Sequence, residues 1–378
     1  MTAPPAGSLR LMLAGDVMTG RGIDQVLPHP GDPALREPVC RSARDYVRLA
    51  ERRHGPLPAP LPFAHVWGDL PEDLAAARCD LRLVNLETAV TARGAPEPKG
   101  INYRMHPDNM PVLAAGGIDG CGLSNNHVLD WGRDGLLDTL DALDRSGIAR
   151  AGAGRSLAEA EAPAALPLPG GGRVLFLALA RTDSGVPPAW AATEDRPGLC
   201  LLPREPEAAA ALLHRILAPV RRAGDIVVAS VHWGGNWGFD VPETQERLAE
   251  AMVARAGVDV VMGHSAHHPK RAALVDGRLV LFGCGDLIND YEGLGGHGEY
   301  LPDAAVAWLV DLDRREGRLL RLEALVYERR RFRLCRAAPA LRDAVAGVIG
   351  AGLPGALRRD EPNRILLIPS GPGQGAQS

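Results

Sequence analysis

The stretch GDIVVASVHWGGNWGFDVPETQERLAEAMVARAGVDVVMGHSAHH, residues 224–268, decides the fold. Two valine-rich apolar runs within it, residues 226–231 and 258–262, predict strands. The segment between them, residues 243–255, predicts a helix, because Pro242 directly precedes it and proline is favoured at a helix start. A strand, a helix and a second strand in this order are typical of a β-α-β unit with parallel strands.

The same alternation extends over the first two thirds of the chain. Further strands are predicted at residues 9–14, 81–86, 118–123 and 174–178, and further helices at 134–146 and 207–222. After Gly263 the pattern changes to two antiparallel hairpins, one around Asp276-Gly277 and one around residues 315–317. We therefore expect an α/β sandwich of two sheets flanked by helices, with antiparallel hairpins towards the C-terminus.

Composition limits the class of protein. The 378 residues are 46% apolar and 23% charged with a formal net charge of −4, and the charges are mixed, so we expect no nucleic-acid partner. The six cysteines are scattered without a C-x-x-C pair, which favours a reducing compartment. Because neither a signal peptide nor an apolar run of about 20 residues is present, we expect a cytoplasmic protein without a membrane anchor.

The domain organisation is predicted to be simple. Residues 9–369 are expected to form one domain, with a disordered lead-in at 1–8 and a disordered tail at 370–378. Nothing in the sequence predicts an oligomeric state.

Polar clusters follow five of the predicted strands. These clusters are Gly15 to Met18, Asn85 to Glu87, Asn125 to His127, His232 to Gly234, and Gly263 to His268. Because the carboxyl ends of parallel strands lie at one edge of a sheet, these side chains are expected to meet there. Their carboxylate, amide and imidazole groups suit divalent metals such as Zn, Mn, Fe or Co. The alternative is structural, since asparagine favours turns and Asp16 is a suitable helix cap.

Several of these clusters belong to longer motifs that occur in order along the chain. They are GDVMTGRG (15–22), NLETAVT (85–91), SNNHVLDWGRDGLLDTLDAL (124–143), AGAGRSLAEAEAP (151–163), SVHWGGNW (230–237), GHSAHHP (263–269) and GRLVLFGCGDLI (277–288). In these motifs the chain resembles the CapA family, which is named for poly-γ-glutamate capsule biosynthesis. The fold of that family is similar to that of calcineurin-like metallophosphoesterases.

The resemblance implies a four-layer αββα sandwich with a centre of one or two divalent metal ions between the sheets. The implied ligands are Asp16, Glu87, Asn126, His232, His264 and His267. His127 would be a general acid or a hydrogen-bond donor to the substrate, and Arg21 a fixed cation for a carboxylate or phosphate. The metal stays open among Mn, Zn, Co, Fe, Ca and Mg.

The chain also departs from the metallophosphoesterase pattern. Met18 stands where that pattern has the histidine of Asp-x-His, Glu87 replaces an aspartate, and the last motif is Gly-His-Ser-Ala-His instead of Gly-His-x-His. One metal position is therefore expected to lack a ligand. Which of His264, His267 and His268 coordinate is left open.

Three functions compete on these residues, and the expected substrate of an enzyme is a peptide or small polyamide. The first expectation is a metal-dependent epimerase without an organic cofactor, acting at the Cα of the C-terminal residue of a ribosomal, lasso-type peptide. The reason is that the chain resembles soluble CapA-like proteins of ribosomal peptide biosynthesis, which also lack a membrane anchor. His127 with His268 or Glu292 would then be the two bases, and Trp233 or Trp237 an apolar wall. The alternatives are hydrolysis of an amide (γ-glutamyl) or phosphoester bond, and a binding or scaffold protein. The loop at residues 285–297 is a candidate lid.

Overall fold

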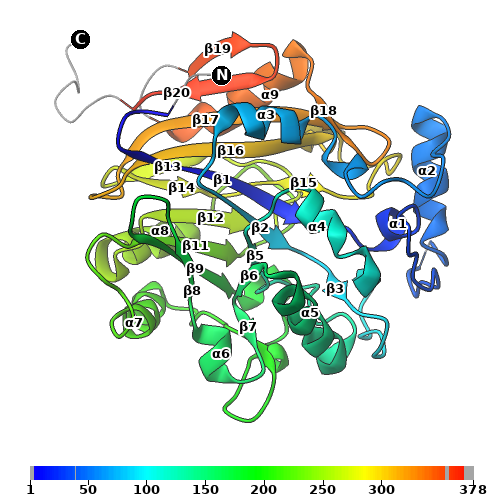
Figure 1. The fold of residues 1–378 in the computed structure, drawn as a ribbon, viewed down its shortest axis with the longest axis horizontal. Coiled ribbons are helices and arrows are strands. Elements are labelled where there is room, and N and C mark those ends of the chain that lie inside the picture. The colour runs from blue at the N-terminus through cyan, green and yellow to red at the C-terminus, as the bar shows by residue number, and fades with distance from the viewer. Residues whose placement is uncertain (1–3, 39, 354–356, 370–378) are drawn as a thin grey trace.

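The computed structural model describes residues 4–38, 40–353 and 357–369, and within them two large sheets lie face to face (Figure 1). The larger sheet has the order β19 (Leu357–Glu361), β20 (Arg364–Leu367), β17 (Leu319–Arg329), β16 (Ala304–Asp313), β1 (Ser8–Val17), β2 (Leu81–Leu86), β5 (Gly120–Gly122) and β6 (Ala149–Ala151), with β15 (Asp286–Ile288) beside β1 and β18 (Leu334–Arg336) beside β17. The smaller sheet has the order β13 (Ala272–Val275), β14 (Arg278–Leu281), β12 (Val260–His264), β11 (Ile226–His232), β9 (Arg173–Ala180) and β8 (Ala164–Pro167).

Short elements and helices complete the fold. Two small strand pairs join β3 (Ala89–Val90) to β4 (Arg104–Met105) and β7 (Ala153–Gly154) to β10 (Gly198–Leu199). The helices are α1 (Arg21–Asp24), α2 (Arg44–His54), α3 (Leu70–Ala77), α4 (Pro111–Ala115), α5 (Gly132–Ser146), α6 (Leu157–Glu161), α7 (Pro206–Leu217), α8 (Glu243–Ala256) and α9 (Pro339–Ile349).

Side-chain alternation along the strands produces the layers. In β1, Leu11 and Leu13 point between the sheets, where they join Phe176 of β9 in one core cluster. Met12, on the opposite face of β1, packs in a second cluster with residues of α3, α4 and α5. A third cluster lies between the smaller sheet and helices α7 and α8. The chain is therefore an αββα sandwich, as expected from the sequence.

Both sheets are mixed, and the predicted connections are present. β11 and β12 are parallel neighbours joined through α8, whereas β13–β14 and β16–β17 are antiparallel hairpins. The C-terminal part is not purely antiparallel, because β14 pairs in parallel with β12 and β15 pairs in parallel with β1. Helix α9 was not predicted, and it contributes Val345 and Ile349 to the core between the sheets.

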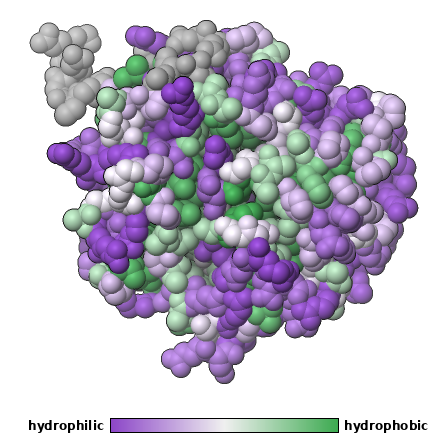
Figure 2. Space-filling view, in the orientation of Figure 1, coloured by the Kyte–Doolittle hydropathy of each residue, from purple (hydrophilic) through white to green (hydrophobic). Residues whose placement is uncertain are grey.

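Some sequence-based boundaries need adjustment. β1 begins at Ser8, the last residue of the expected lead-in; residues 1–3 and the expected disordered tail at 370–378 lie outside the described residues. The first part of the candidate lid is a buried strand, β15, and not a loop. Within the described residues, no helix is both long enough and apolar enough to cross a bilayer. Hydrophilic residues cover most of the face in Figure 2, with apolar ones gathered towards its middle.

Candidate metal centre

Strand register brings the predicted polar residues to one place. In the larger sheet, Asp16 at the end of β1 is in register with Asn85 of β2 on one side and with Asp286 of β15 on the other. In the smaller sheet, His232 and His264 are direct partners at the ends of β11 and β12. The carboxyl ends of strands from both sheets therefore meet at this site, as parallel α/β architecture predicts.

Two groups of side chains at this site are spaced to hold a metal ion. Asp16, Glu87 and His232 form one group, and Asp16, His267 and Asp286 form the other; within each group the candidate ligand atoms all lie within 4.8 Å of one another. Asp16 belongs to both groups, and every member is buried. A shared carboxylate is the arrangement expected where two ions lie side by side.

The hydrogen bonding of these side chains fits a cation. Asp16 Oδ2, Glu87 Oε1, both ring nitrogens of His232 and Nε2 of His264 are buried without a hydrogen-bond partner. The same is true of Asn126 Oδ1. A buried polar atom without a partner costs about 1–3 kcal/mol, so several at one point call for a ligand. Carboxylate oxygens and imidazole nitrogens are donors that divalent metals of the Zn, Mn and Fe type accept.

Two asparagines orient the carboxylates from behind. The amide of Asn85 donates to Asp16 Oδ1 and to Glu87 Oε2, at 2.8 Å in both cases. Asn125 donates in turn to Asn85 Oδ1 at 3.0 Å and to the carbonyl of Leu86 at 2.9 Å. These bonds fix the side chains that face the proposed ions, as outer-layer residues do in metal sites.

Burial and neighbouring charges shift the pKa values of the candidate ligands. Burial, together with the charge of Asp16, holds the pKa of Glu87 well above its usual range. Burial also disfavours a charged Asp16, but His264, His232 and the amide of Asn85 together outweigh it, and the pKa of Asp16 is lowered. Burial lowers the pKa of His232 to about 3, so its imidazole is neutral and has a lone pair for a metal at neutral pH.

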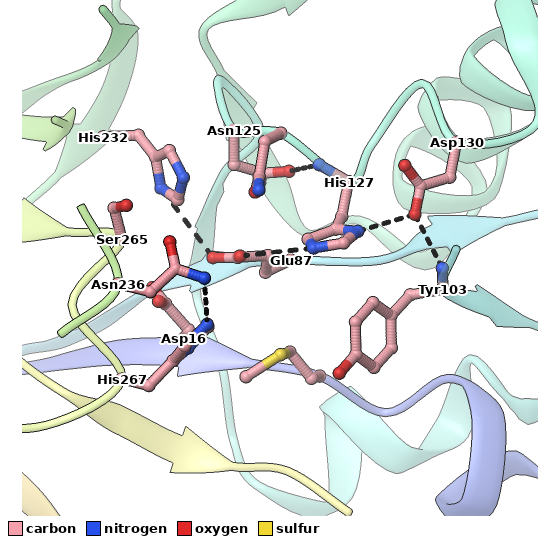
Figure 3. A network of polar contacts seen from close by, with 12 residues as sticks. Asp16, Glu87, Tyr103, Asn125, His127, Asp130, His232, Asn236, Ser265 and His267 are labelled. Carbon is pink, nitrogen blue, oxygen red and sulfur yellow. Dashed lines mark hydrogen bonds and ion pairs between the residues drawn. The ribbon is translucent and has the colours of Figure 1, made fainter. Parts of the chain in front are cut away.

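His127 is fixed beside the metal groups by a second network (Figure 3). Its Nδ1 lies 2.6 Å from Asp130 Oδ2, and Lys99 Nζ lies 2.6 Å from the other oxygen of that carboxylate. Lys99 also donates to the backbone carbonyl of Asn126. His127 Nε2 is left facing Glu87 Oε1 at 4.0 Å, and burial lowers the pKa of His127 to about 4. The arrangement is that of an acid–base histidine oriented by a carboxylate.

Comparison with known proteins matches this architecture to one family. The family model described as bacterial capsule synthesis protein PGA_cap matches residues 10–291. A probable polyglutamine synthesis accessory protein of Mycobacterium tuberculosis is 43% identical over 330 residues, which is 86% of each chain.

The chain belongs to the PGA_cap family.

More distant relatives have related names. The PGA biosynthesis protein CapA of Bacillus subtilis is 29% identical over 288 residues, covering 75% of this chain and 63% of that protein. The capsule biosynthesis protein CapA of Bacillus anthracis is 25% identical over 282 residues, covering 75% of this chain and 60% of that protein. The membership expected from the sequence motifs is thus confirmed.

The PGA_cap chain brings most of the expected ligands together and adds one. Asp16, Glu87, His232 and His267 fall in the two metal groups, and His264 Nδ1 lies 3.1 Å from Asp16 Oδ1. Asp286 was not predicted as a candidate ligand, because the motif GCGDLI places it in an apparent loop. It contributes a carboxylate to the second group, which the motif comparison did not predict. The pairing of β15 with β1, a long-range contact, positions it.

Two residues predicted to bind substrate make structural contacts instead. Arg21 is 3% exposed and is neutralised by Asp290, at 2.9 Å from its Nε, and by Glu37, at 3.0 Å from Nη1. It is therefore not an unengaged cation for a substrate anion. Trp233 is 1% exposed and donates to the carbonyl of Phe282 at 3.0 Å inside the core of the smaller sheet, so it forms no substrate wall.

The two additional candidate bases also differ from expectation. Both oxygens of Glu292 accept backbone N–H groups, from Arg331 at 2.7 Å and from Phe332, so this carboxylate anchors a turn instead of facing the metal groups. The His268 ring contacts the rings of Trp237 and Tyr300, and its Nδ1 is turned towards the carbonyl of Pro269 at 3.0 Å. Burial lowers the pKa of His268 to about 4. Trp237 agrees best with its predicted role as an apolar wall for the substrate, because its ring centroid lies 5.6 Å from that of His267.

Proposed function

We propose that this PGA_cap chain is a metal-dependent hydrolase that cleaves an amide bond in a peptide or polyamide substrate. One observation carries the proposal: two potential metal groups share Asp16, and His127, tied to Asp130, lies beside them. The printed names of the relatives, which refer to polyglutamine synthesis and PGA biosynthesis, support a polyamide as the substrate class.

Each side chain of the site has a distinct role in this proposal. Asp16, Glu87, His232, His267 and Asp286 would hold the ions, with His264 beside Asp16. A bound divalent metal supplies Lewis-acid polarisation of the scissile carbonyl and lowers the pKa of water. In hydrolysis, water adds its oxygen to the carbonyl carbon, the C–N bond breaks and the leaving nitrogen needs a proton. His127 Nε2, which is not engaged by Asp130, would take the proton released by the attacking water and pass it to the leaving nitrogen.

Cα epimerisation of a C-terminal peptide residue is the second candidate, and a specific feature favours it. The structure has two histidine–aspartate pairs around Asp16: His127 with Asp130 at 2.6 Å, and His267 with Asp286 at 3.0 Å. Figure 3 shows the two imidazoles on different sides of Glu87. Two bases on opposite faces are what an epimerase without an organic cofactor requires, and His267 would take the place of the second base, His268 or Glu292, that the sequence indicated.

Isotope labelling tests both candidates at once. The metal-loaded protein is incubated with α- and γ-linked glutamyl oligopeptides and with peptides of mixed sequence, in H₂¹⁸O and separately in D₂O. Hydrolysis puts one ¹⁸O into a new carboxyl group and yields fragments, whereas epimerisation adds one deuteron at Cα without cleavage. His127→Ala is the matched variant, expected to keep the metal and lose turnover. If metal is bound but neither label is incorporated, the protein is a binding protein and the proposal is wrong.

A further inference from the structure

A cavity of about 260 Å³ adjoins the candidate metal centre. Asn236 and His267 form its floor on the metal side, and His267 belongs to the second metal group. The cavity is smaller than the roughly 300–1,000 Å³ typical of sites for drug-sized ligands, so its size suits one side chain of a longer substrate.

The walls of this cavity are mainly apolar and aromatic. Ile101 and Leu294 line it and are 42% and 43% exposed, which places them among the most exposed large hydrophobic residues that the structure describes. Trp237 forms another wall, and the ring of His297 stacks on it with centroids 3.9 Å apart and planes inclined by 9°. Exposed apolar side chains gathered around one opening are typical of a binding site.

The arginine at this cavity offers no unengaged charge to an anionic side chain. The one arginine that lines the cavity is Arg21, whose guanidinium already contacts the carboxylates of Asp290 and Glu37. It also lies over aromatic rings, at 3.6 Å from the centroid of Tyr46 and 4.5 Å from that of Tyr103. A substrate carboxylate entering here would meet a cation that two carboxylates have already neutralised, and it would lose its hydration.

We propose that this cavity is a specificity pocket for a bulky apolar side chain of the substrate residue next to the reacting carbonyl. The inference rests on the proposed function for the position of that carbonyl at the metal centre. It narrows the substrate class to peptides that carry an aromatic or large aliphatic residue at this point, and it disfavours a uniform polyglutamate chain.

Two matched ligands test the preference. N-acetyl-phenylalanine hydroxamate and N-acetyl-glutamate α-hydroxamate carry the same metal-binding group and differ only in their side chain. Calorimetry with the metal-loaded protein is expected to show the phenylalanine compound binding at least about tenfold more tightly, because burying an aromatic ring supplies that difference. Equal affinities, tighter binding of the glutamate compound, or no binding of either to metal-loaded protein would overturn the inference.

Variants locate the preference within the molecule. Ile101→Lys and Leu294→Lys place a cation at the opening and are expected to abolish or reverse it; both positions are exposed, so both chains should fold. The matched control is Val220→Lys, since Val220 is 38% exposed and does not line this cavity. A preference for phenylalanine that survives both pocket substitutions would contradict the assignment.

A metal-free measurement separates this inference from the proposed function. Ligand-observed NMR with the metal-free protein compares N-acetyl-phenylalanine amide with N-acetyl-glutamate amide, neither of which depends on a metal. Binding of the phenylalanine amide that Ile101→Lys removes would support the pocket even if no metal centre forms. Its absence, in a protein that does bind metal, would leave the metal centre intact and remove the pocket.

Discussion

Two regions of this molecule bury several charged side chains, and they do so in opposite ways. In the larger sheet, Arg10 contacts both oxygens of Asp311, at 2.7 and 2.9 Å, and also lies 3.3 Å from Glu323. Arg321 adds a contact to Asp311 at 2.6 Å, and Arg364 one to Glu323 at 2.9 Å. We call these five residues the ion-pair cluster; each carboxylate in it faces arginines.

The candidate metal centre lacks such partners. In the described part of the chain, the ion pairs of Asp16, Glu87 and Asp286 are with histidines alone. Several of its polar atoms have no hydrogen-bond partner, whereas the arginines of the ion-pair cluster saturate Asp311. A buried carboxylate paired with arginine supports the fold, while carboxylates that face one another need a cation from solution.

The largest expected effect is on the ion-pair cluster. Asp311→Ala leaves Arg10 and Arg321 buried without their main carboxylate, which should lower the free energy of unfolding by about 3–5 kcal/mol. Denaturant unfolding measures this loss. The control is Asp141→Ala, which removes an exposed ion pair with Arg155 and should change stability by about 0.5 kcal/mol or less. A similar small effect of both substitutions would break the distinction between the two regions.

Substitutions in the candidate metal centre should change the affinity for metal and not the stability of the fold. His232→Ala removes a ligand from the first metal group, so affinity for the metal should fall by more than about 100-fold while the metal-free protein keeps its fold. Elemental analysis and chelator competition with Mn, Zn, Co, Fe, Ca and Mg give the affinity and the number of ions. His214→Ala, at an exposed position on α7, should leave both unchanged. Parent protein that binds none of these metals would contradict the metal centre.

Substitution of Asn85, which lies behind the candidate ligands, should have an intermediate effect on metal affinity. Asn85→Ala removes the amide that donates to both Asp16 and Glu87, so metal affinity should fall about 10- to 100-fold. Asn85→Asp should weaken binding as well, because it replaces the donor by a third carboxylate oxygen that repels the other two. Chelator competition measures both variants. Unchanged affinity in both would mean that Asn85 serves the sheet and not the metal centre.

Local sequence patterns were sufficient for the architecture and for the candidate ligands that lie together at the strand ends. Hydrophobic runs and an Asp-Gly turn predict β11, α8, β12 and the β13–β14 hairpin, because these features depend on neighbours in the chain. Asp16, Glu87 and His232 could be predicted for the same reason, since each ends or directly follows an apolar run.

Residues whose roles depend on long-range contacts could not be assigned in this way. Asp286 becomes a candidate ligand only through the pairing of β15 with β1, some 270 residues away. Glu292 has the chemistry of a base, but the backbone N–H groups of Arg331 and Phe332 occupy it. Arg21 similarly meets Asp290, and the short motif around it gives no sign of that partner. Side-chain type indicates possible chemistry, while tertiary contacts decide whether it is available.

Lys99 is a further example, and it gives the smallest predicted effect. It lies in a proline- and glycine-containing loop without a recognisable motif, yet its Nζ contacts Asp130 at 2.6 Å and lies 3.3 Å from His127 Nδ1. Lys99→Met should therefore leave metal content unchanged and lower kcat about tenfold, a part of the roughly 10²–10⁴-fold that a positioned acid–base group supplies. Lys99→Arg should restore most of the rate, because it retains the cation.

The decisive readout is the orientation of His127 itself. In protein labelled with ¹⁵N-histidine, the Nδ1–H signal of His127, assigned by its loss in His127→Ala, reports the hydrogen bond to Asp130. Lys99→Met should shift or broaden this signal. Arg93→Met, a substitution in the same loop as Lys99 that removes an exposed ion pair with Asp138 of helix α5, should not. If Lys99→Met lowers stability but moves neither the signal nor kcat, Lys99 only supports the loop. Lys99 would then have a structural role, like the arginines of the ion-pair cluster, and Asp130 alone would position His127.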